Sequence, residues 1–385
     1  MVMRTQKVRL YPNRTMQKVI DELCDYRRYC WNQGLSLWND MYEVSLIMEN
    51  RKLRPSEYKV RNELVTNKQD WQDLLSARCL QLAISDLAKA WRNFLTKSQP
   101  DCGKPKFKSK RAPRQGFKTD RAKIVNGKLR LDKPRANQQA WYDISFSRVQ
   151  PLQGELKVVS IYRENGQYWA SLPFEVTTEA KDKTGVATAV DVNVGHMNYS
   201  AGKVNVLPAT LQRLYKRIKH YQRTLVRKRK LNGKEATKSN NYMQTRAKLQ
   251  RDYRKVANCQ HDIIQKFTTM LVMEYDQIVI EDLNVKQMQM THVASKGLQR
   301  SLFGYFRQVL TYKCTWYGKE LVLADRFYPS TQRCSRCGHV KTGEDKLTLQ
   351  GNQKHCTRHN EYHCYACGAM LNRDENAVAN LLQLI

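Results

Sequence analysis

Two Cys-x-x-Cys pairs near the end of the chain constrain its fold more than any other feature. They are Cys334-Ser-Arg-Cys337 and Cys364-Tyr-Ala-Cys367, and a glycine follows each pair. Four thiolates on two such turns form a closed tetrahedral Zn²⁺ site of the zinc-ribbon type, which has a structural role. A redox-active cysteine pair is the alternative. We predict Zn²⁺ coordination by Cys334, Cys337, Cys364 and Cys367.

The distribution of the cysteines favours a metal site over disulfides. The chain has 11 cysteines, an odd number, and five of them lie between Cys334 and Cys367. This pattern indicates a reducing compartment and a metal site rather than a disulfide framework. Other potential ligands inside the ribbon could replace one thiolate or form a second site, namely His355, Cys356, His359 and His363.

Three carboxylates are placed where one α/β domain would bring them together. The strand-like run 185–190 ends in Asp191, and a second run, 276–280, ends in Glu281. Asp374 stands at the start of a short apolar helix that closes the chain. Strands that alternate with helices, with acids at two strand ends and at one helix start, predict a ribonuclease H-like α/β domain.

This set of carboxylates suits two hard divalent cations. Carboxylate oxygens hold Mg²⁺ or Mn²⁺, and two such ions about 4 Å apart activate water and neutralise the leaving oxygen in phosphodiester hydrolysis. Asp191 is the predicted bridging ligand, and Glu281 and Asp374 are predicted to hold one ion each. For each acid taken singly, the alternative is a surface charge, or a helix cap in the case of Asp374. The ordered set of three acids predicts catalysis instead. Asp282 and Glu375 are predicted to be bystanders.

The charge balance indicates a polyanionic partner. The chain has 67 Lys and Arg against 35 Asp and Glu, which gives a net charge of +32. Such an excess strains a compact fold unless an anionic partner neutralises it, and nucleic acid is the partner it implies. A membrane surface is the competing interpretation. Since no apolar stretch approaches ~18 residues and no signal pattern begins the chain, we expect a soluble, unexported protein without a membrane partner.

Two basic segments are the candidate nucleic-acid contacts. Residues 101–135 form a Pro-punctuated basic loop, and residues 209–256 form a helical pair with dense Lys and Arg and a break at Asn232-Gly233. A solvated charged face is the alternative for both segments. The predicted contacts are Lys104, Lys106, Lys108, Lys110, Arg111, Arg213, Lys216, Arg217, Arg223, Arg227 and Lys228.

The first half of the chain reads as a β domain that carries a helical insert. Residues 3–11 alternate as a strand, and helical spacing follows over about 14–48 and 76–95. Asn-Gly turns at 126–127 and 165–166 predict hairpins, and together these strands predict a small antiparallel barrel or sandwich. The aromatic residues of Tyr26-Arg-Arg-Tyr-Cys-Trp31 are predicted to be helical core, and stacking on exposed bases is the alternative.

The second half alternates between strands and helices. The expected strands cover 186–190, 197–200, 203–207, 276–280 and 320–324. The expected helices are the basic pair, whose second member continues through Leu271, and an amphipathic helix over 298–316. The fold class predicted for the chain is therefore multidomain α+β.

Four motifs of the second half occur in a specific order and spacing. They are Ile278-Val-Ile-Glu-Asp-Leu-Asn-Val285, Tyr328-Pro-Ser330 before Cys334-Ser-Arg-Cys-Gly338, Cys364-Tyr-Ala-Cys-Gly368 and Asn372-Arg-Asp-Glu-Asn-Ala-Val-Ala-Asn380. Together they resemble the TnpB family, RNA-guided nucleases encoded by insertion sequences and related to compact type V CRISPR effectors. The likeness covers 185–385 firmly and extends loosely to the start through the Lys104-Pro-Lys-Phe-Lys108 patch.

The resemblance implies a domain plan. The implied parts are a β-barrel-like wedge domain (1–12 and 99–180), a helical recognition insert (13–98), a RuvC-type nuclease domain (181–328 and 371–385) and a zinc ribbon (329–370). Two positions depart from the family pattern. Asn193 replaces a glycine common in relatives, so the local turn is expected to differ, and Asn372 replaces an acid found there in many relatives.

The resemblance also implies a function. It implies a bound guide RNA, recognition of a short motif beside a double-stranded DNA target, and metal-dependent cleavage by one site. A guided repressor that binds without cutting and a transposase proper are the alternatives, and the three retained acids and the cysteine ribbon argue against them. The expected location is the cytoplasm of a prokaryotic host, at the nucleoid.

Overall fold

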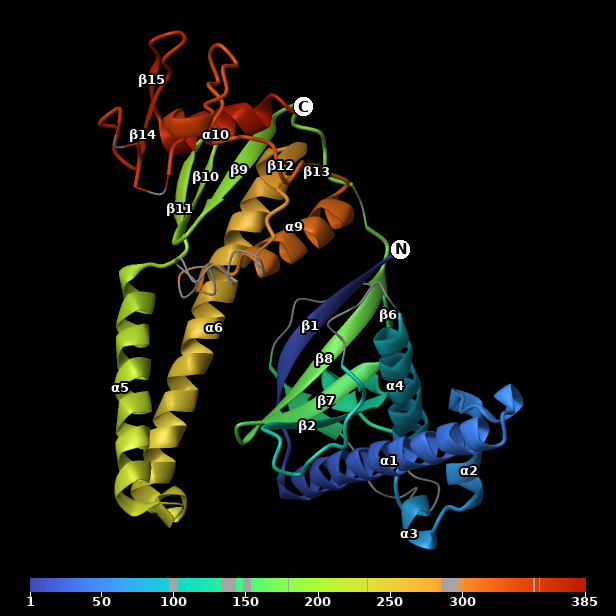
Figure 1. Ribbon diagram of the computed structural model, residues 1–385. Coiled ribbons are helices and arrows are strands. Elements are labelled where there is room, and N and C mark those ends of the chain that lie inside the picture. The colour runs from blue at the N-terminus through green and yellow to red at the C-terminus, as the bar shows by residue number, and fades with distance from the viewer. Residues whose placement is uncertain are drawn as a thin grey trace. The chain divides into compact units, whose positions relative to one another are not determined.

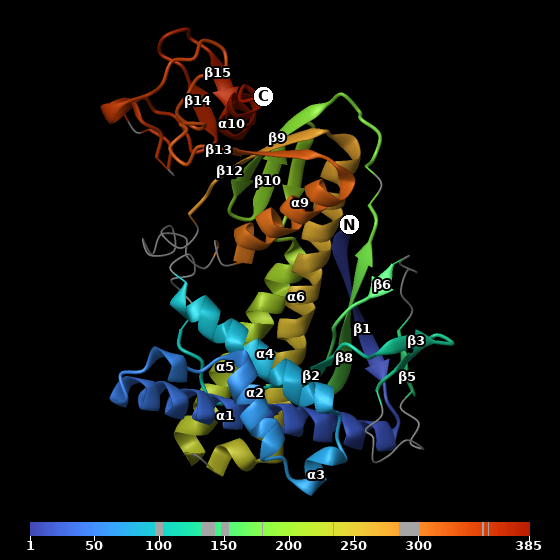
Figure 2. The same cartoon turned by 90° about the vertical axis from the view of Figure 1, so that its right-hand side faces the viewer.

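The chain divides into two compact units, residues 1–177 and 178–385, and each is described here by itself. The computed structural model is shown in Figure 1 and, turned by 90°, in Figure 2. Within the part of the chain that the structure describes, no helix is both long and apolar enough to cross a membrane. The described residues are 1–96, 103–132, 143–147, 154–178, 180–233, 235–284, 297, 300–348, 350–352 and 354–385.

The first unit is built on one eight-stranded sheet in the order β2-β7-β8-β1-β5-β4-β3, with β6 paired to β8. All of its pairs are antiparallel, and the longest joins β1 to β8 over Val2–Leu10. The strands are β1 (Val2–Tyr11), β2 (Arg114–Thr119), β3 (Lys123–Val125), β4 (Lys128–Arg130), β5 (Asp143–Phe146), β6 (Glu155–Leu156), β7 (Val159–Glu164) and β8 (Gln167–Val176).

The predicted hairpin turns of this sheet are confirmed. Asn126-Gly127 and Asn165-Gly166 all have positive φ, as a two-residue turn that matches the twist of the strands requires. The described strands form one hydrogen-bonded sheet rather than two separate sheets. Within the described strands, β2 and β3 each pair with only one neighbour, and the sheet does not close into a barrel.

The helices of the first unit lie between β1 and β2 in sequence, as the predicted insert requires. Helices α1 and α4 match the expected spans. The structure adds two shorter helices and a 3₁₀ turn that were not predicted. The elements are α1 (Arg14–Ile47), the turn at Arg51–Leu53, α2 (Glu57–Thr66), α3 (Asp70–Asp73) and α4 (Ala77–Leu95).

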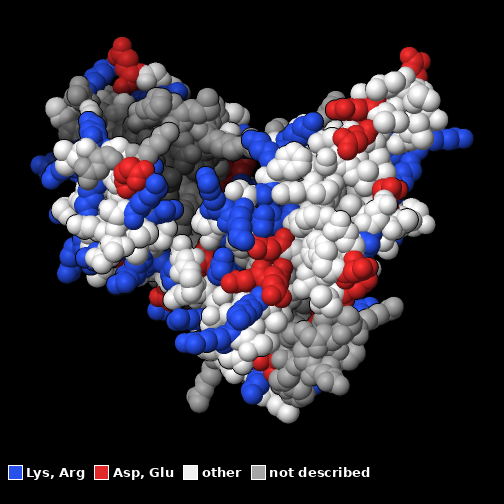
Figure 3. Space-filling model, turned by 90° about the horizontal axis from the view of Figure 1, so that it is seen from below, with Lys and Arg blue, Asp and Glu red and all other residues white. Residues whose placement is uncertain are grey.

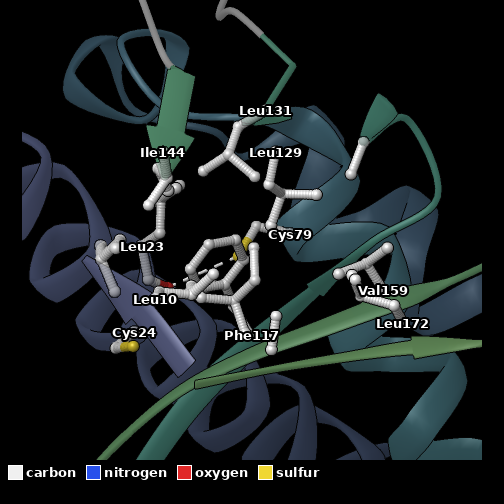
Figure 4. Packing of buried hydrophobic residues seen from close by; sticks show 14 of the residues in the cluster. Leu10, Leu23, Cys24, Cys79, Phe117, Leu129, Leu131, Ile144, Val159 and Leu172 are labelled. Atoms are coloured by element: carbon white, nitrogen blue, oxygen red, sulfur yellow. Dashed lines mark hydrogen bonds between the residues drawn. The ribbon is translucent and has the colours of Figure 1, made fainter. Parts of the chain in front are cut away.

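The core of the first unit fills the space between α1, α4 and one face of the sheet (Figure 4). Leu10, Leu23, Phe117 and Ile144 meet there, and all are at most 6% exposed. Tyr26 and Trp31 are also buried, so their predicted core role is confirmed. Burying an aromatic side chain of this kind contributes about 2–3 kcal/mol.

The second unit contains a mixed five-stranded sheet in the order β11-β10-β9-β12-β13. Strands β9, β12 and β13 are parallel to one another, whereas β10 pairs antiparallel with β9, and β11 pairs antiparallel with β10 at the edge. The bounds are β9 (Ala187–Asn193), β10 (His196–Tyr199), β11 (Gly202–Asn205), β12 (Gln277–Glu281) and β13 (Glu320–Ala324). Each expected strand is confirmed: β13 has the expected bounds, and the other four strands shift by one to three residues at their ends.

Helices cover both faces of this sheet (Figures 1 and 2). Helices α6 and α9 pack on one face through a large apolar cluster, and α10 packs on the other through a smaller cluster. The predicted start of α9 at 298 lies outside the described residues. The helices are α5 (Ala209–Asn232), α6 (Asn240–Glu274), α9 (Phe303–Tyr317) and α10 (Arg373–Leu382).

The cysteine region leaves the sheet after β13 and returns at α10. It contains a 3₁₀ turn (Gly343–Asp345) and a short hairpin of β14 (Glu361–His363) and β15 (Met370–Asn372). Another 3₁₀ turn, Glu235–Lys238, lies between α5 and α6. The small core of the cysteine region contains Cys334, Leu347, Tyr362 and Cys364. Regions with so little apolar core commonly gain stability from a metal or another crosslink.

Candidate active site and cysteine cluster

The alternation of side chains along β9 and β12 places two of the predicted acids under α10. Ala189 and Val279 pack with α10, whereas Val190 and Ile280 pack with α6 and α9 on the opposite face. Since side chains two positions apart point to the same face of a strand, Asp191 and Glu281 point toward α10. Helix α10 carries Asp374 in its first turn.

Asp191 lies close enough to Glu281 and Asp374 for their charges to act on it. Burial, and then the charges of Glu281 and Asp374, raise the pKa of Asp191 to about 7. Burial also raises the pKa of Glu281, although a hydrogen bond from Ser330 lowers it. Asp191 is only 4% exposed. A buried carboxylate beside two others is unfavourable without cations, so the donor set fits hard divalent ions.

The cysteines are gathered more closely than the acids. Within the described residues, the four cysteines form the one group of three or more His, Cys, Asp or Glu side chains placed to hold a metal ion, and their sulfur atoms lie within 4.8 Å of one another. The wider spacing of Asp191, Glu281 and Asp374 suits acids that would share two cations.

Two asparagines that depart from the family pattern have local roles. Asn193 continues β9, and its Nδ2 donates a hydrogen bond of 2.7 Å to Oδ2 of Asp191. The turn follows at Gly195, whose φ of +93° favours glycine. Oδ1 of Asn372 accepts hydrogen bonds from the backbone N–H groups of Asp374 and Glu375 and thereby caps α10.

The structure adds two polar neighbours that the sequence did not reveal. Nε2 of His196 on β10 lies 3.2 Å from Oδ2 of Asp374, and the hydroxyl of Ser330 donates to Oε1 of Glu281 at 2.5 Å. No sequence pattern marked either residue, although Ser330 belongs to a family motif. Asp282 instead forms ion pairs with Arg307 and Arg326.

A cleft of about 530 Å³ opens beside Asp374, between the β10–β11 hairpin and α10. Its lining includes Ser200, Lys203 and Glu375, together with apolar residues of α10. Nδ2 of Asn198, also in the lining, is buried and has no hydrogen-bond partner within the described residues. A polar cleft with an unused donor next to the acids can receive part of an extended substrate.

The four predicted zinc ligands meet as two matching turns. The N–H of Gly338 donates to the carbonyl of Cys334, and the N–H of Gly368 donates to that of Cys364, both at 2.9 Å. Both glycines have positive φ. Four sulfur atoms within 4.8 Å of one another fit a tetrahedral metal site.

The predicted second ligand set does not assemble in the described part of the ribbon. His355 instead pairs with Asp345 at 2.8 Å and stacks on Tyr365.

Several basic residues of the predicted loop contact their own fold. Lys108 lies over the ring of Trp31 at 3.5 Å, and burial lowers its pKa to about 7. Lys110 pairs with Asp25 at 3.0 Å, and Lys104 lies over Trp91. Lys106 and Arg111 are exposed. Residues 97–102 and 133–142, in or beside this loop, lie outside the described residues.

Helix α5 separates its basic residues into two groups. Arg213, Lys216, Arg223 and Arg227 are exposed and recur at helical spacing on the face opposite the buried Leu211, Ile218 and Leu225. Arg217 makes two hydrogen bonds to the buried Asp252 of α6. Lys228 donates to Asn241 and Thr245 of the same helix. Figure 3 shows Lys and Arg spread over one face of the molecule.

Three family models match parts of the chain. The model described as "Probable transposase" matches 171–291, and the model described as "Cas12f1-like, TNB domain" matches 303–381. A model described as "Helix-turn-helix domain" matches 1–45. Over those residues the structure has β1 and the single long helix α1, rather than two helices joined by a turn.

Two relatives are similar along most of the chain. A protein of Streptomyces pristinaespiralis named "Putative RNA-guided DNA endonuclease" is 28% identical over 99% of this chain and 89% of its own length. The Escherichia coli (strain K12) protein "Putative RNA-guided DNA endonuclease InsQ" is 26% identical over 92% of this chain and 85% of its own.

A solved structure shares the fold. The chain aligns with a protein in the cryo-EM structure of the Cas12f1-sgRNA-target DNA complex with a TM-score of 0.55, over 99% of this chain and 98% of that one. The sequences are 12% identical. At that identity the likeness supports the multidomain α+β fold alone.

Proposed function

Because this chain is related along nearly its whole length to the TnpB family of insertion-sequence-encoded RNA-guided nucleases, we propose that it is a metal-dependent, RNA-guided DNA endonuclease of a mobile element. The observation that carries the proposal is the meeting of Asp191, Glu281 and Asp374 on the α10 side of the sheet. Its partners would be a guide RNA and double-stranded DNA, in the cytoplasm of a prokaryotic host.

The domain plan expected from the sequence is retained as part of this proposal. A RuvC-type nuclease domain comprises 181–328 and 371–385, with the zinc ribbon of 329–370 between. The wedge domain comprises 1–12 and 99–180, and the recognition insert comprises 13–98. The two compact units observed, 1–177 and 178–385, divide the chain near the boundary between wedge and nuclease domains.

The acid site would hold two Mg²⁺ or Mn²⁺ ions through Asp191, Glu281 and Asp374. When bound, these ions supply an activated water and charge neutralisation on the departing oxygen. Asn193 holds the carboxylate of Asp191 in one orientation, and the cap by Asn372 fixes the first turn of α10. The cleft beside Asp374 would receive the strand to be cut, with Lys203 at its rim.

The cysteine cluster would hold Zn²⁺ in a structural role. Because Cys334, Cys337, Cys364 and Cys367 are all thiols, they fill a tetrahedral site completely and leave no position for a substrate. Specificity would come from pairing between guide and target, while the protein holds the duplex by its backbone. The exposed basic stripe of α5 is our candidate for that contact.

The test is to purify the chain from cells that also carry its own flanking DNA. We expect a discrete RNA to co-purify, and Mg²⁺-dependent cleavage of a plasmid that contains the sequence matching this RNA. Asp191→Ala should abolish cleavage while leaving target binding intact. Binding without cleavage by the native chain would indicate a guided repressor, and strand joining would indicate a transposase. Unguided cutting without bound RNA would contradict the proposal.

A further inference from the structure

The loop over 328–335, here called the entry loop, leads from β13 into the first cysteine turn. Its residues form hydrogen bonds with β12 and α10, the elements that carry Glu281 and Asp374. One set of contacts reaches α10, which carries Asp374, and another reaches Glu281 at the end of β12. The cysteine turn begins at Cys334, immediately after Arg333 of this loop.

The contacts to α10 depend on two buried carboxamides spaced by four residues. Nδ2 of Asn376 donates to the carbonyl of Arg333 at 2.7 Å. Nδ2 of Asn380 donates to the carbonyls of Arg333 and Ser330 at 2.6 and 2.8 Å. Both side chains are at most 2% exposed. A spacing of four places both amides on the same face of the helix.

The same helix also bonds inside the cysteine turn. Oδ1 of Asn376 accepts a hydrogen bond of 2.9 Å from the N–H of Ser335, which lies between Cys334 and Cys337. A carboxamide that donates to one peptide and accepts from another fixes the orientation of both. Asn376 lies two residues after Asp374, so the position of the first turn of α10 is linked to that of the cysteine turn.

The contact to the sheet is a direct bond to a predicted metal ligand. The hydroxyl of Ser330 donates to Oε1 of Glu281 at 2.5 Å, and Ser330 is itself 3% exposed. The donor leaves one oxygen of Glu281 for other ligands. A hydrogen bond to a ligating carboxylate orients it in metal sites generally.

We infer that the entry loop is a positioning element: Ser330 orients Glu281, and Asn376 and Asn380 hold Asp374 in register with it, so that an ordered cysteine cluster is required for cation binding at the acids. This inference rests on the proposed function for the identity of the acid site. Ser330, Asn376 and Asn380 are positioning residues, because each acts through an acid rather than on the substrate.

The test measures cation binding directly, by Mn²⁺ electron paramagnetic resonance on the full-length chain after removal of bound nucleic acid. Asp191→Ala provides the background that does not arise from the acid site. We expect Ser330→Ala to weaken Mn²⁺ binding about 5- to 20-fold, as loss of a second-shell partner does, and Ser330→Thr to restore it. The zinc content and melting temperature of Ser330→Ala should match those of the native chain.

The Asn positions are tested against a neighbour on the same helix. Asn380→Asp replaces the amide that donates to two carbonyls with a carboxylate, which can only accept. This substitution should weaken Mn²⁺ binding at least as much as Ser330→Ala does. Gln383→Ala is the matched control, because Gln383 also bonds to Ser335 but at the exposed end of α10. It should leave Mn²⁺ binding unchanged.

Two results would overturn the inference. One is native Mn²⁺ affinity in Ser330→Ala, and the other is native affinity in the chain stripped of zinc with a strong chelator. If Asn380→Asp lowered only the melting temperature and left Mn²⁺ affinity native, the buried amides would be merely structural. Failure of guided cleavage with normal Mn²⁺ binding would instead count against the proposed function.

Discussion

The cysteine cluster and the acid cluster are assembled in opposite ways. The cysteines come from one stretch of chain, 334–367, and two similar backbone turns bring their sulfur atoms within 4.8 Å. The acids come from β9, β12 and α10, and only the completed sheet and its covering helix bring them together. The first site therefore depends on local geometry, and the second depends on the whole unit.

The two clusters also differ in what they do to stability. Four thiolates around one ion would close a small region that has little apolar core of its own. At the acids, burial and the charges of two neighbouring carboxylates, Glu281 and Asp374, disfavour the ionised form of Asp191. The first cluster would stabilise the fold around it when its metal is bound, whereas the second is destabilised by its surroundings, as functional sites commonly are.

The largest effect is expected at the acids. Asp191→Asn and Glu281→Gln should each lower the cleavage rate by roughly 10³-fold or more, because removing one member of a catalytic set that acts as a unit disables the whole set. Guide and target binding should remain, since neither change alters the fold around the acid. Single-turnover cleavage and gel-shift binding with one target measure both. Cleavage within tenfold of native would remove these residues from the active site.

The next effect should appear at the cysteines, in folding rather than chemistry. Cys334→Ser or Cys364→Ser should lose the metal, and structural zinc supplies on the order of 10 kcal/mol in small zinc domains. Hydrogen exchange should then show the ribbon open while the five-stranded sheet stays protected. Cys356→Ser is the control, because Cys356 lies in the ribbon but outside the cluster. Equal zinc content in Cys334→Ser would disprove the ligand assignment.

A third experiment tests the effect of burial and of the neighbouring charges on Asp191. In the metal-free chain the pKa of Asp191 is raised from 3.8 to about 7. The folded state thus binds a proton more tightly than the unfolded state, and its contribution to stability is lost as pH rises from about 4 to about 7. Denaturant unfolding with a chelator should show this decline, and Asp191→Asn should flatten it. An unchanged slope in the variant would mean that other groups cause the decline.

The smallest effect per residue is expected away from both clusters, on α5. Replacing Arg213, Lys216, Arg223 and Arg227 with Gln should weaken the salt dependence of nucleic-acid binding. The slope of the log binding constant against the log salt concentration should fall in magnitude by about 3. Arg217→Gln is a matched contrast, since its partner Asp252 is buried and would lose an ion pair. Arg217→Gln should lower the melting temperature and should change the slope of the salt dependence little. If the four-residue variant kept the native slope, the stripe would be a solvated face.

The contrast between the clusters also explains what the sequence could predict. The spacing of the cysteines was enough to select Cys334, Cys337, Cys364 and Cys367, because two backbone turns of the same form bring all four together. The acids could be chosen because each stands at the end of an expected strand or the start of an expected helix. The roles of His196 and Ser330 could not be predicted, because no spacing links either residue to the acids, and Ser330 was marked only as part of the Tyr328-Pro-Ser330 motif. Their roles arise from the approach of β10 to α10 and of the entry loop to β12.

The basic residues show a different limit. Composition correctly indicated dense positive charge on α5, but it did not separate Arg217 and Lys228 from the stripe. That separation depends on which residues of α6 lie opposite, Asp252 and Asn241 among them. Similarly, Lys108 is engaged because α1 presents Trp31 to it. Side-chain partners distant in sequence decide these roles.

Helix α6 has a mechanical consequence. Its 35 residues make one rod of roughly 50 Å. The first half packs against α5 through Val256 and its neighbours, and the second half packs on the sheet through Phe267 and Leu271. Because the helix is continuous, a force on the far end of the α5–α6 hairpin would also act on the sheet whose strands carry Asp191 and Glu281.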